Sequence, residues 1–276
     1  MEEYEIVVSD PAKNITLFVL NQEKMTGEKR LDAARRLMAL PDIGAEQVGF
    51  VEPPGTPAGL WRLEMAGGEF CGNAARSFGL FVALTQGLSG SVAVPVSISG
   101  AKNPVMTVVN TKAGRAAAAI PAPAARAALD FRGQEVGVYQ FDGITHLIAP
   151  DIPPCRESFF ALKALWERGG QSAPALGVLF YDKERDLMTP AVYVFQTDTL
   201  VFESSCGSGS AAFGVWRSEG LKDGDARCAV HQPGGVIDVI VVKRNSRLCG
   251  LWIGGTVSLS LRPASGGSIS FQRSGF

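Results

Sequence analysis

The chain has 276 residues, of which 46% are hydrophobic and 19% are charged, and its formal net charge is −1. This composition is typical of a globular protein that can bury a full hydrophobic core, in one large domain or two of ordinary size. The balanced charge carries no electrostatic footprint for nucleic acid or for an anionic membrane surface.

The sequence also argues against a membrane span or a secretion signal. The longest apolar stretches, such as Phe78–Leu84 and Val236–Val242, are too short to cross a bilayer. The first residues are acidic and lack the basic and then apolar pattern of a signal peptide. We therefore expect a cytoplasmic protein that binds neither membrane nor nucleic acid.

The first half of the chain predicts a series of strands and two helices. Apolar residues recur at helical spacing over Thr26–Leu40, where Thr26 can cap a helix that Pro41 ends. A second helix is expected from the first of two cysteine motifs to about Leu84. The predicted strands are Tyr4–Val8, Ile15–Leu20, Gln47–Val51, Leu60–Met65, Val92–Val96, Val105–Val109 and Gly114–Ile120.

A change of composition separates this half from the next. Prolines interrupt the alanine-rich residues 121–128, which are therefore the expected connector between two halves, with a surface loop inside one domain as the alternative. Helices are expected over Glu157–Arg168 and from the second cysteine motif to about Ser218. The predicted strands are Val136–Phe141, Thr145–Ala149, Leu176–Tyr181, Ala191–Gln196, Val236–Val242 and Leu251–Leu259.

A cysteine motif occurs once in each half. Residues 67–76 read GGEFCGNAAR around Cys71, and residues 203–212 read ESSCGSGSAA around Cys206. In both, a polar turn leads to the cysteine, and a glycine, small residues and an apolar run that can be helical follow it. The two cysteines are separated by about half the chain, which fits an internal duplication that gives each half one thiol.

Two thiols at two helix N-termini suggest acid–base chemistry at a carbon atom. The N–H groups of Gly72, Asn73, Gly207 and Ser208 would bind a carboxylate at the positive ends of the helix dipoles. The same dipoles are expected to lower the pKa of the cysteines, so that one thiol becomes a base while the other stays protonated as the acid. The pair predicts a cofactor-independent racemase or epimerase.

The other cysteines and the histidines lack such a context. Cys155, Cys228 and Cys249 are expected to be structural, and an odd total of five argues against a disulfide framework. His146 and His231 are the only histidines and are expected to be structural as well. Neither the spacing of a zinc site nor a dinucleotide-binding fingerprint is present, so we expect no metal and no other cofactor.

The paired motifs resemble those of the diaminopimelate epimerase family of cofactor-independent amino-acid racemases and epimerases. The resemblance covers nearly the whole chain: Asn14 and Gln47 match the family's substrate-site asparagine and glutamine, and Gln232 opens a matching late turn. It implies an α+β fold of two similar halves, 1–120 with a returning strand at 266–276 and 121–265. Each half would wrap a sheet around a central helix, with the active site in the cleft between them. The family also makes a homodimer the expected assembly.

Departures from the family pattern bear on the substrate. Three segments that hold the distal group of diaminopimelate in the family correspond here to Gly143–His146, Gly177 and Thr197-Asp198, and their polar anchors are lost. Asp198 lies where the family has positive charge, which favours a neutral or cationic side chain such as the imidazole of histidine, and Glu46 could serve likewise. The sequence is most similar to the histidine racemase branch.

Two alternatives remain open on the sequence alone. The nearest is diaminopimelate epimerase itself, which converts the LL form to the meso form. The other belongs to a different class, a redox-responsive binding protein with a disulfide between Cys71 and Cys206. For Asp198 the alternative is a solvated turn residue, and for Glu46 it is an exposed acid.

Overall fold

A computed structural model describes residues 4–20, 25, 27–56 and 59–263. The chain forms two compact units, which we call unit 1 (Met1–Ala119 with Gly254–Phe276) and unit 2 (Ile120–Ile253). The chain therefore passes from one unit to the other twice, the second time within a strand. The predicted returning strand at 266–276 and the predicted cap Thr26 lie outside the described residues.

Unit 1 is a mixed sheet with two helices. Its helices are α1 (Gly27–Met38) and α2 (Gly72–Thr85). Its strands are β1 (Glu5–Asp10), β2 (Thr16–Val19), β3 (Gln47–Glu52), β4 (Arg62–Met65), β5 (Ser91–Ile98), β6 (Val105–Asn110), β7 (Arg115–Ala119) and β17 (Ser258–Pro263). They are hydrogen-bonded in the order β7-β6-β5-β4-β3-β2-β1-β17, and the pairs β2–β3 and β4–β5 are parallel.

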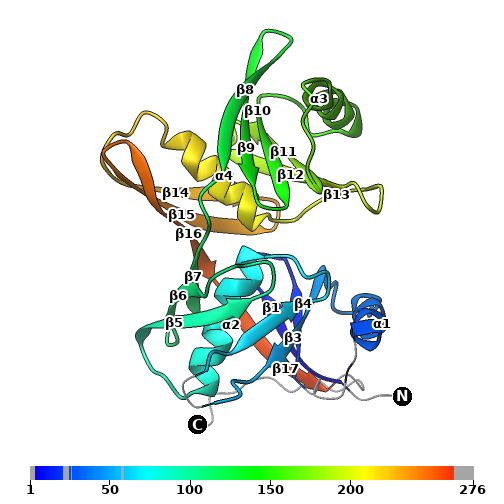
Figure 1. Ribbon diagram of the computed structural model, residues 1–276, viewed down its shortest axis with the longest axis vertical. Coiled ribbons are helices and arrows are strands. Elements are labelled where there is room, and N and C mark those ends of the chain that lie inside the picture. The colour runs from blue at the N-terminus through cyan, green and yellow to red at the C-terminus, as the bar shows by residue number, and fades with distance from the viewer. Residues whose placement is uncertain (1–3, 21–24, 26, 57–58, 264–276) are drawn as a thin grey trace. The chain divides into compact units, whose positions relative to one another are not determined.

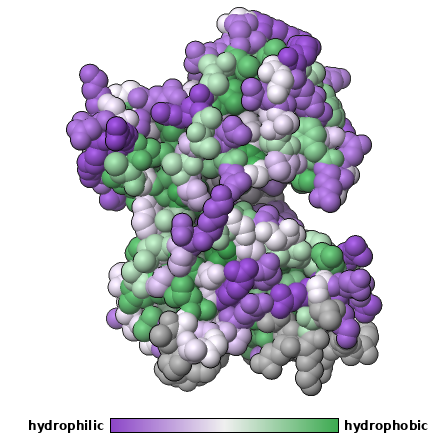
Figure 2. Space-filling view, in the orientation of Figure 1, coloured by the Kyte–Doolittle hydropathy of each residue, from purple (hydrophilic) through white to green (hydrophobic). Residues whose placement is uncertain are grey.

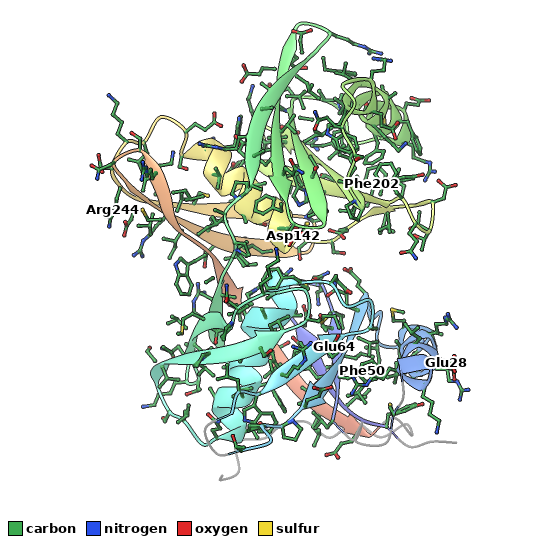
Figure 3. The ribbon with its side chains drawn as sticks, viewed as in Figure 1. Glu28, Phe50, Glu64, Asp142, Phe202 and Arg244 are labelled. Atoms are coloured by element: carbon green, nitrogen blue, oxygen red, sulfur yellow. The ribbon has the colours of Figure 1, made fainter. Side chains whose placement is uncertain are left out.

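The alternation of buried residues explains why one helix lies on each face of this sheet. In β2, Phe18 packs against α2, where its ring meets that of Phe78 edge-on at 5.7 Å, while Leu17 belongs to the cluster around α1. Phe50 of β3 also lies toward α1 (Figure 3). Helix α2 lies within the curve of the strands and α1 lies outside it (Figure 1). The central helix is therefore α2, which carries the first cysteine motif.

Unit 2 repeats this plan. Its helices are α3 (Arg156–Arg168) and α4 (Gly207–Arg217). One sheet has the order β13-β12-β11-β10-β9-β8, and three further strands have the order β14-β15-β16. These strands are β8 (Ala125–Phe131), β9 (Gln134–Phe141), β10 (Ile144–Pro150), β11 (Ala175–Asp182), β12 (Leu187–Val194), β13 (Thr199–Phe202), β14 (Gly224–Gln232), β15 (Gly235–Arg244) and β16 (Arg247–Thr256), the last of which continues into unit 1.

Strand β11 shows the same division between two faces. Val178 and Phe180 join the cluster around α3, whereas Tyr181 packs edge-on against Phe213 of α4 at 4.7 Å. Helix α4 contacts strands of both groups, β10 and β11 on one side and β14 and β15 on the other. It is the central helix of unit 2, and it carries the second cysteine motif.

Several strands were not predicted from the sequence. Residues 121–128 are not simply a connector, because β8 begins at Ala125 and pairs with β9 along its whole length, from Ala125 opposite Gln140 to Phe131 opposite Gln134. This ladder outweighs the low strand preference of alanine. The strand β14 was missed because polar residues interrupt its apolar pattern, and β13 was missed because it has only four residues. The single strand expected over Leu251–Leu259 is two, β16 and β17.

Each central helix lies unusually close to its sheet at one glycine, at the same offset from its cysteine. A Cβ atom at Gly79 would lie 2.1 Å from Oγ1 of Thr107, and one at Gly214 would lie 2.4 Å from Cγ1 of Val239. Neither position has room for a side chain unless the helix or the strand moves. The shared position of the two glycines is consistent with the duplication that the cysteine motifs suggest.

The surface and the helices bear on the membrane expectation. On the face shown in Figure 2, hydrophilic side chains alternate with small apolar areas. Within the described ranges, no helix is both long enough and apolar enough to cross a membrane.

We predict that Gly79→Ala lowers the free energy of unfolding by about 1 to 3 kcal/mol, as overpacking does in well-packed cores. Alanine favours helices, so helix preference alone would give the opposite sign. The side chain of Thr107 cannot rotate away from the added Cβ, because its hydroxyl donates to the Val94 carbonyl at 2.6 Å and its other atoms are also close. Urea unfolding measures the difference.

The matched control is Gly27→Ala at the start of α1, where no atom lies within 4 Å of the added Cβ. That variant should be as stable as the parent or slightly more stable. Equal effects of the two substitutions would contradict the close approach of α2 to its sheet.

Candidate functional site

The first cysteine is the N-cap of α2. Cys71 has φ −122° and ψ 116°, and its sulfur accepts a hydrogen bond from the N–H of Ala74 at 3.4 Å. The preceding loop is fixed by Ser99, whose hydroxyl donates to the carbonyl of Glu69 at 3.0 Å. Gly100, at φ +72°, lies directly behind this loop, and a Cβ there would clash with the backbone. The sequence contains no signal that would have identified Ser99.

The second cysteine is the N-cap of α4 with nearly the same geometry. Cys206 has φ −127° and ψ 117°, and its sulfur accepts from the N–H of Gly209 at 3.4 Å. The side chain of Gln232 accepts from the N–H of Cys206 at 2.8 Å and donates to Ser210, which in turn donates to the Cys206 carbonyl. The turn that opens at Gln232 therefore holds the cysteine loop. The motif was visible in the sequence, but this role was not.

Burial acts against the helix N-terminus at both thiols. The residue Cys71 keeps some solvent exposure, but its sulfur lies among protein atoms, and this burial raises the pKa of Cys71 to about 11 although the N–H of Ala74 lowers it. Burial, followed by the charge of Glu203, raises the pKa of Cys206 well above its usual value, against the hydrogen bonds from Ser208 and Gly209. The expected lowering of the thiol pKa is therefore wrong, because desolvation outweighs the helix dipole.

In unit 1, a chain of hydrogen bonds joins Asn73 and Asn14, both predicted substrate-site residues, to Arg76 at one end and Glu46 at the other. Arg76 Nε donates to Asn73 Oδ1 at 3.1 Å, and Asn73 Nδ2 donates to Asn14 Oδ1 at 3.1 Å. Asn14 Nδ2 then donates to Glu46 Oε2 at 2.6 Å. The structure thus brings Asn14, Asn73 and Glu46 together beside the first cysteine motif. Burial raises the pKa of Glu46, and the hydrogen bond from Asn14 partly offsets this.

Gln47 lies beside the first thiol. Its side chain makes a hydrogen bond to Cys71 that lowers the pKa of the thiol. The other end of the amide, Oε1, is buried and has no protein partner. A buried acceptor without a partner is costly unless something else donates to it. Gln47 therefore offers a hydrogen-bond acceptor to a ligand bound next to Cys71.

Ser208 connects the second thiol to a buried histidine. Its hydroxyl lies 3.6 Å from the Cys206 sulfur and 2.9 Å from Nε2 of His146. His146 is fully buried against Phe141, and burial lowers its pKa to about 3, so its ring is neutral. Nδ1 has no protein partner and rests on Gly177, where a Cβ would lie 2.3 Å away.

These contacts select one tautomer of His146. A buried lone pair without a partner costs less than a buried N–H without one, so the proton belongs on Nε2. The ring then donates to Ser208, whose own O–H is left to point at the Cys206 sulfur. His146 was expected from the sequence to be structural, because its partner Ser208 lies far from it along the chain.

Asp198 is not brought to the second cysteine. It lies in the turn between β12 and β13 at φ +52°, where it accepts a hydrogen bond from the hydroxyl of Tyr193. The Tyr193 ring packs with Phe159 on the α3 side of the sheet. The contacts of Ser208 and His146 are instead on the α4 side. Of the two acidic residues considered for the substrate side chain, the structure places only Glu46 beside predicted site residues.

The remaining cysteines have other environments. Cys155 is the N-cap of α3, where hydrogen bonds from the hydroxyl and N–H of Ser158 lower its pKa. Burial raises the pKa of Cys228. In the part of the chain that the structure describes, no group of His, Cys, Asp or Glu is arranged to hold a metal ion.

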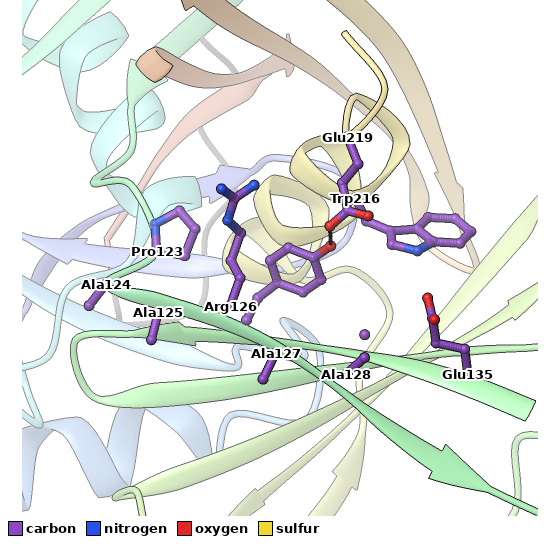
Figure 4. Close-up of a pocket in the computed structure, with 11 residues that line it drawn as sticks. Pro123, Ala124, Ala125, Arg126, Ala127, Ala128, Glu135, Trp216 and Glu219 are labelled. Atoms are coloured by element: carbon purple, nitrogen blue, oxygen red, sulfur yellow. Dashed lines mark hydrogen bonds between the residues drawn. The ribbon is translucent and has the colours of Figure 1, made fainter. Parts of the chain in front are cut away.

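A pocket of about 590 Å³ lies at the other end of α4 (Figure 4). The wall includes Arg126, Trp216 and Tyr139, whose hydroxyl donates to Glu219. Burial and this acceptor raise the pKa of Tyr139, so the phenol stays protonated. The 11 residues of α4 separate this end from Cys206 by about 16 Å, so the pocket is not part of the cysteine site.

Known proteins resemble this chain in sequence over most of its length. Residues 3–266 match the family described as the histidine racemase CntK N-terminal domain. A histidine racemase of Fusobacterium nucleatum is 28% identical over 253 residues, which cover 86% of this chain and 89% of that protein. A histidine racemase of Staphylococcus aureus is 26% identical over 248 residues, which cover 87% and 88%.

The solved structure of a protein described as a predicted epimerase from Pseudomonas aeruginosa has 13% identity, a TM-score of 0.64, and coverage of 96% of this chain and 100% of that one. This likeness confirms the expected α+β epimerase fold. The match to the family extends over almost the whole chain. The chain belongs to the family of the histidine racemase CntK N-terminal domain, and it is an isomerase of the racemase class.

Proposed function

We propose that this protein interconverts the L and D forms of an amino acid, with histidine as the best candidate, and that Cys71 and Cys206 carry the α-proton. The observation that carries the proposal is the pair of N-cap thiols, which have matching backbone angles in two units of the same plan. Two-base inversion needs one acid and one base of similar strength on opposite sides of the α-carbon. Two thiols in equivalent settings meet that need without a cofactor.

The two helix N-termini would hold the substrate carboxylate. The first N–H groups of a helix have no partner within the helix, and here they belong to Gly72 and Asn73 in α2 and to Gly207 and Ser208 in α4. The buried acceptor Oε1 of Gln47 suits the substrate ammonium group. Together these groups would orient the α-carbon next to the thiols.

The raised pKa of the thiols suits this reaction. An α-proton is a very weak acid, and a base of high pKa removes it more readily than one of low pKa. Burial makes each thiolate a stronger base but also a rarer species. In each direction of the reaction one thiol would be ionised and act as the base, while the other stays protonated and acts as the proton donor. The roles reverse for the other enantiomer.

Glu46 supports a substrate with a neutral or cationic side chain. A carboxylate that accepts from Asn14 can pair with an imidazole or imidazolium group, whereas the distal carboxylate of diaminopimelate would be repelled. The names of the two curated relatives point to histidine as well. Diaminopimelate epimerization and a redox switch between Cys71 and Cys206 are the alternatives that the following experiment separates.

We predict that the reduced enzyme in deuterated water replaces the α-proton of L-histidine and produces D-histidine. Proton NMR follows the loss of the α-proton signal, and chiral chromatography follows inversion. Cys71→Ser and Cys206→Ser should each abolish racemization, since a serine hydroxyl is too weakly acidic to replace a thiol in either role.

The panel includes lysine, ornithine, proline and LL-diaminopimelate, and Cys249→Ser, at an exposed position, is the control that should retain full activity. Exchange of diaminopimelate alone would establish the epimerase alternative. No exchange of any member under reducing conditions would overturn the racemase proposal and favour the redox one.

A second prediction concerns pH. Because ionisation of one thiol is required, kcat/KM should rise as pH increases above neutrality toward the Cys71 pKa of about 11, and it should fall once both thiols are ionised. Peptide-resolved alkylation with iodoacetamide measures the thiols separately. Cys155 should react at the lowest pH, because its pKa is lowered. Motif thiols that react as readily as Cys155 at neutral pH would contradict the effect of burial.

A third prediction tests the path from His146 to the second thiol. His146→Leu removes the donor to Ser208, so the Cys206 thiolate loses support and its pKa should rise further. The lost bond joins two neutral groups and contributes about 0.5 to 1.5 kcal/mol, so the thiolate population and kcat/KM should fall by about twofold to tenfold. Alkylation of Cys206 in the Cys71→Ser background gives the measurement.

His146→Gln is the conservative partner, since its amide N–H can replace the Nε2–H donor and should restore most of the thiolate. If the leucine and glutamine variants alkylate alike while both fold, the histidine fills space and does not act through Ser208.

A further inference from the structure

We propose that Arg76 is a positioning residue of the first cysteine site: it fixes the direction of the Asn73 and Asn14 amides, so that both present N–H groups and Glu46 is held as an acceptor. The inference rests on the proposed function only for its effect on catalysis. Arg76 was not among the site residues predicted from the sequence. Its side chain is completely buried in the second turn of α2.

The position of Arg76 is unfavourable for stability alone. A cation near a helix N-terminus is opposed by the helix dipole, and burial of a guanidinium carries a desolvation penalty. Its contacts include the Asn73 side chain and the carbonyl of Thr256, which accepts from Nη1 at 3.3 Å. Because these two effects are unfavourable, we look for a role of Arg76 other than helix formation.

The direction of the chain follows from donor chemistry. A guanidinium can only donate, so the atom of Asn73 that faces Nε must be the carbonyl oxygen. Nδ2 of Asn73 then faces Asn14, whose oxygen must accept it, and Nδ2 of Asn14 must face Glu46. One fixed donor at the buried end therefore determines both amide orientations.

This direction discriminates between the two states of Glu46. The ionised carboxylate accepts from Asn14 Nδ2 at 2.6 Å. A protonated Glu46 could still accept this bond through its other oxygen, but a neutral acceptor makes a weaker hydrogen bond than a carboxylate. For the O–H of Glu46 to donate to Asn14, that amide would have to turn its oxygen toward Glu46, which would leave Nδ2 of Asn73 facing another donor. The amide chain therefore favours the ionised form, against burial and the nearby charge of Asp10, which itself pairs with Lys13. Without Arg76 the amides can rotate, and both states find partners.

The test is a carbon-13 NMR titration of the Glu46 side-chain carboxyl in the full-length protein without substrate, assigned with Glu46→Gln. In Arg76→Met and in Asn73→Leu, the pKa of Glu46 should rise above that of the parent, because the protonated acid gains a hydrogen bond. Asn73→Leu keeps the arginine charge and interrupts only the chain. Circular dichroism confirms that each variant is folded, and Asn73→Leu carries the test if Arg76→Met does not fold.

A rise in Asn73→Leu establishes the amide chain. A rise in Arg76→Met alone assigns the effect to the charge of Arg76 through space and overturns the inference, as does an unchanged titration in both. In activity assays at a fixed histidine concentration below KM, the acidic limb of kcat/KM should move to higher pH in Arg76→Met, with about a tenfold loss near that limb.

The two proposals fail in different ways. Because the titration needs no substrate, absence of racemase activity leaves the result on Arg76 intact. Conversely, an active racemase whose Glu46 titrates identically in all variants would reject Arg76 as a positioning residue while the proposed reaction stands. A purely structural Arg76 would lower stability without moving the pH at which Glu46 ionises.

Discussion

Enclosure of each central helix by its sheet is the constraint on which the rest of the structure depends. It places the N-terminus of α2 and of α4 among protein atoms, and so it places the capping thiol there as well. Desolvation then raises the pKa of both thiols by more than the helix dipole and the backbone N–H groups lower it. The glycines that let helix and sheet approach so closely, Gly79 and Gly214, belong to the same arrangement. In the reaction proposed above, burial would make the thiolates stronger bases, and the bound substrate would complete the site.

The two units share a plan but supply different partners to their thiols. In unit 1 the sulfur meets the amide of Gln47, and the residue after the motif glycine, Asn73, turns away into the chain toward Glu46. In unit 2 the equivalent residue, Ser208, meets both the sulfur and His146. The conserved part is the backbone of the cap, and the divergent part is what adjusts each thiol and the substrate pocket. Duplication accounts for the pair of caps, and divergence accounts for the different side chains around each thiol.

Local patterns in the sequence predicted the parts of the structure that local physics determines. The helix α1, most of the strands and both helices that follow the cysteine motifs were predicted from periodicity and from the repeated motif, and the family resemblance pointed to Asn14 and Gln47. Strand β8 was missed because its partner strand, not its own alanines, makes it extended. The direction in which the thiol pKa values shift was predicted wrongly, because the burial that raises them arises only when the sheet has assembled around the helix. His146 and Arg76 act on partners that only the fold brings near, and Asp198 is drawn away by Tyr193 in the same manner.

The high pKa of the motif thiols also has a consequence for survival in an oxidising cell. Peroxides and electrophiles attack thiolates, not thiols. A protein that keeps Cys71 and Cys206 protonated exposes little of the vulnerable species. The pKa of Cys155, the N-cap of α3, is lowered instead, so an oxidant would react with this thiol before the motif thiols. In the proposed reaction, the same burial would protect the two thiols that carry the α-proton.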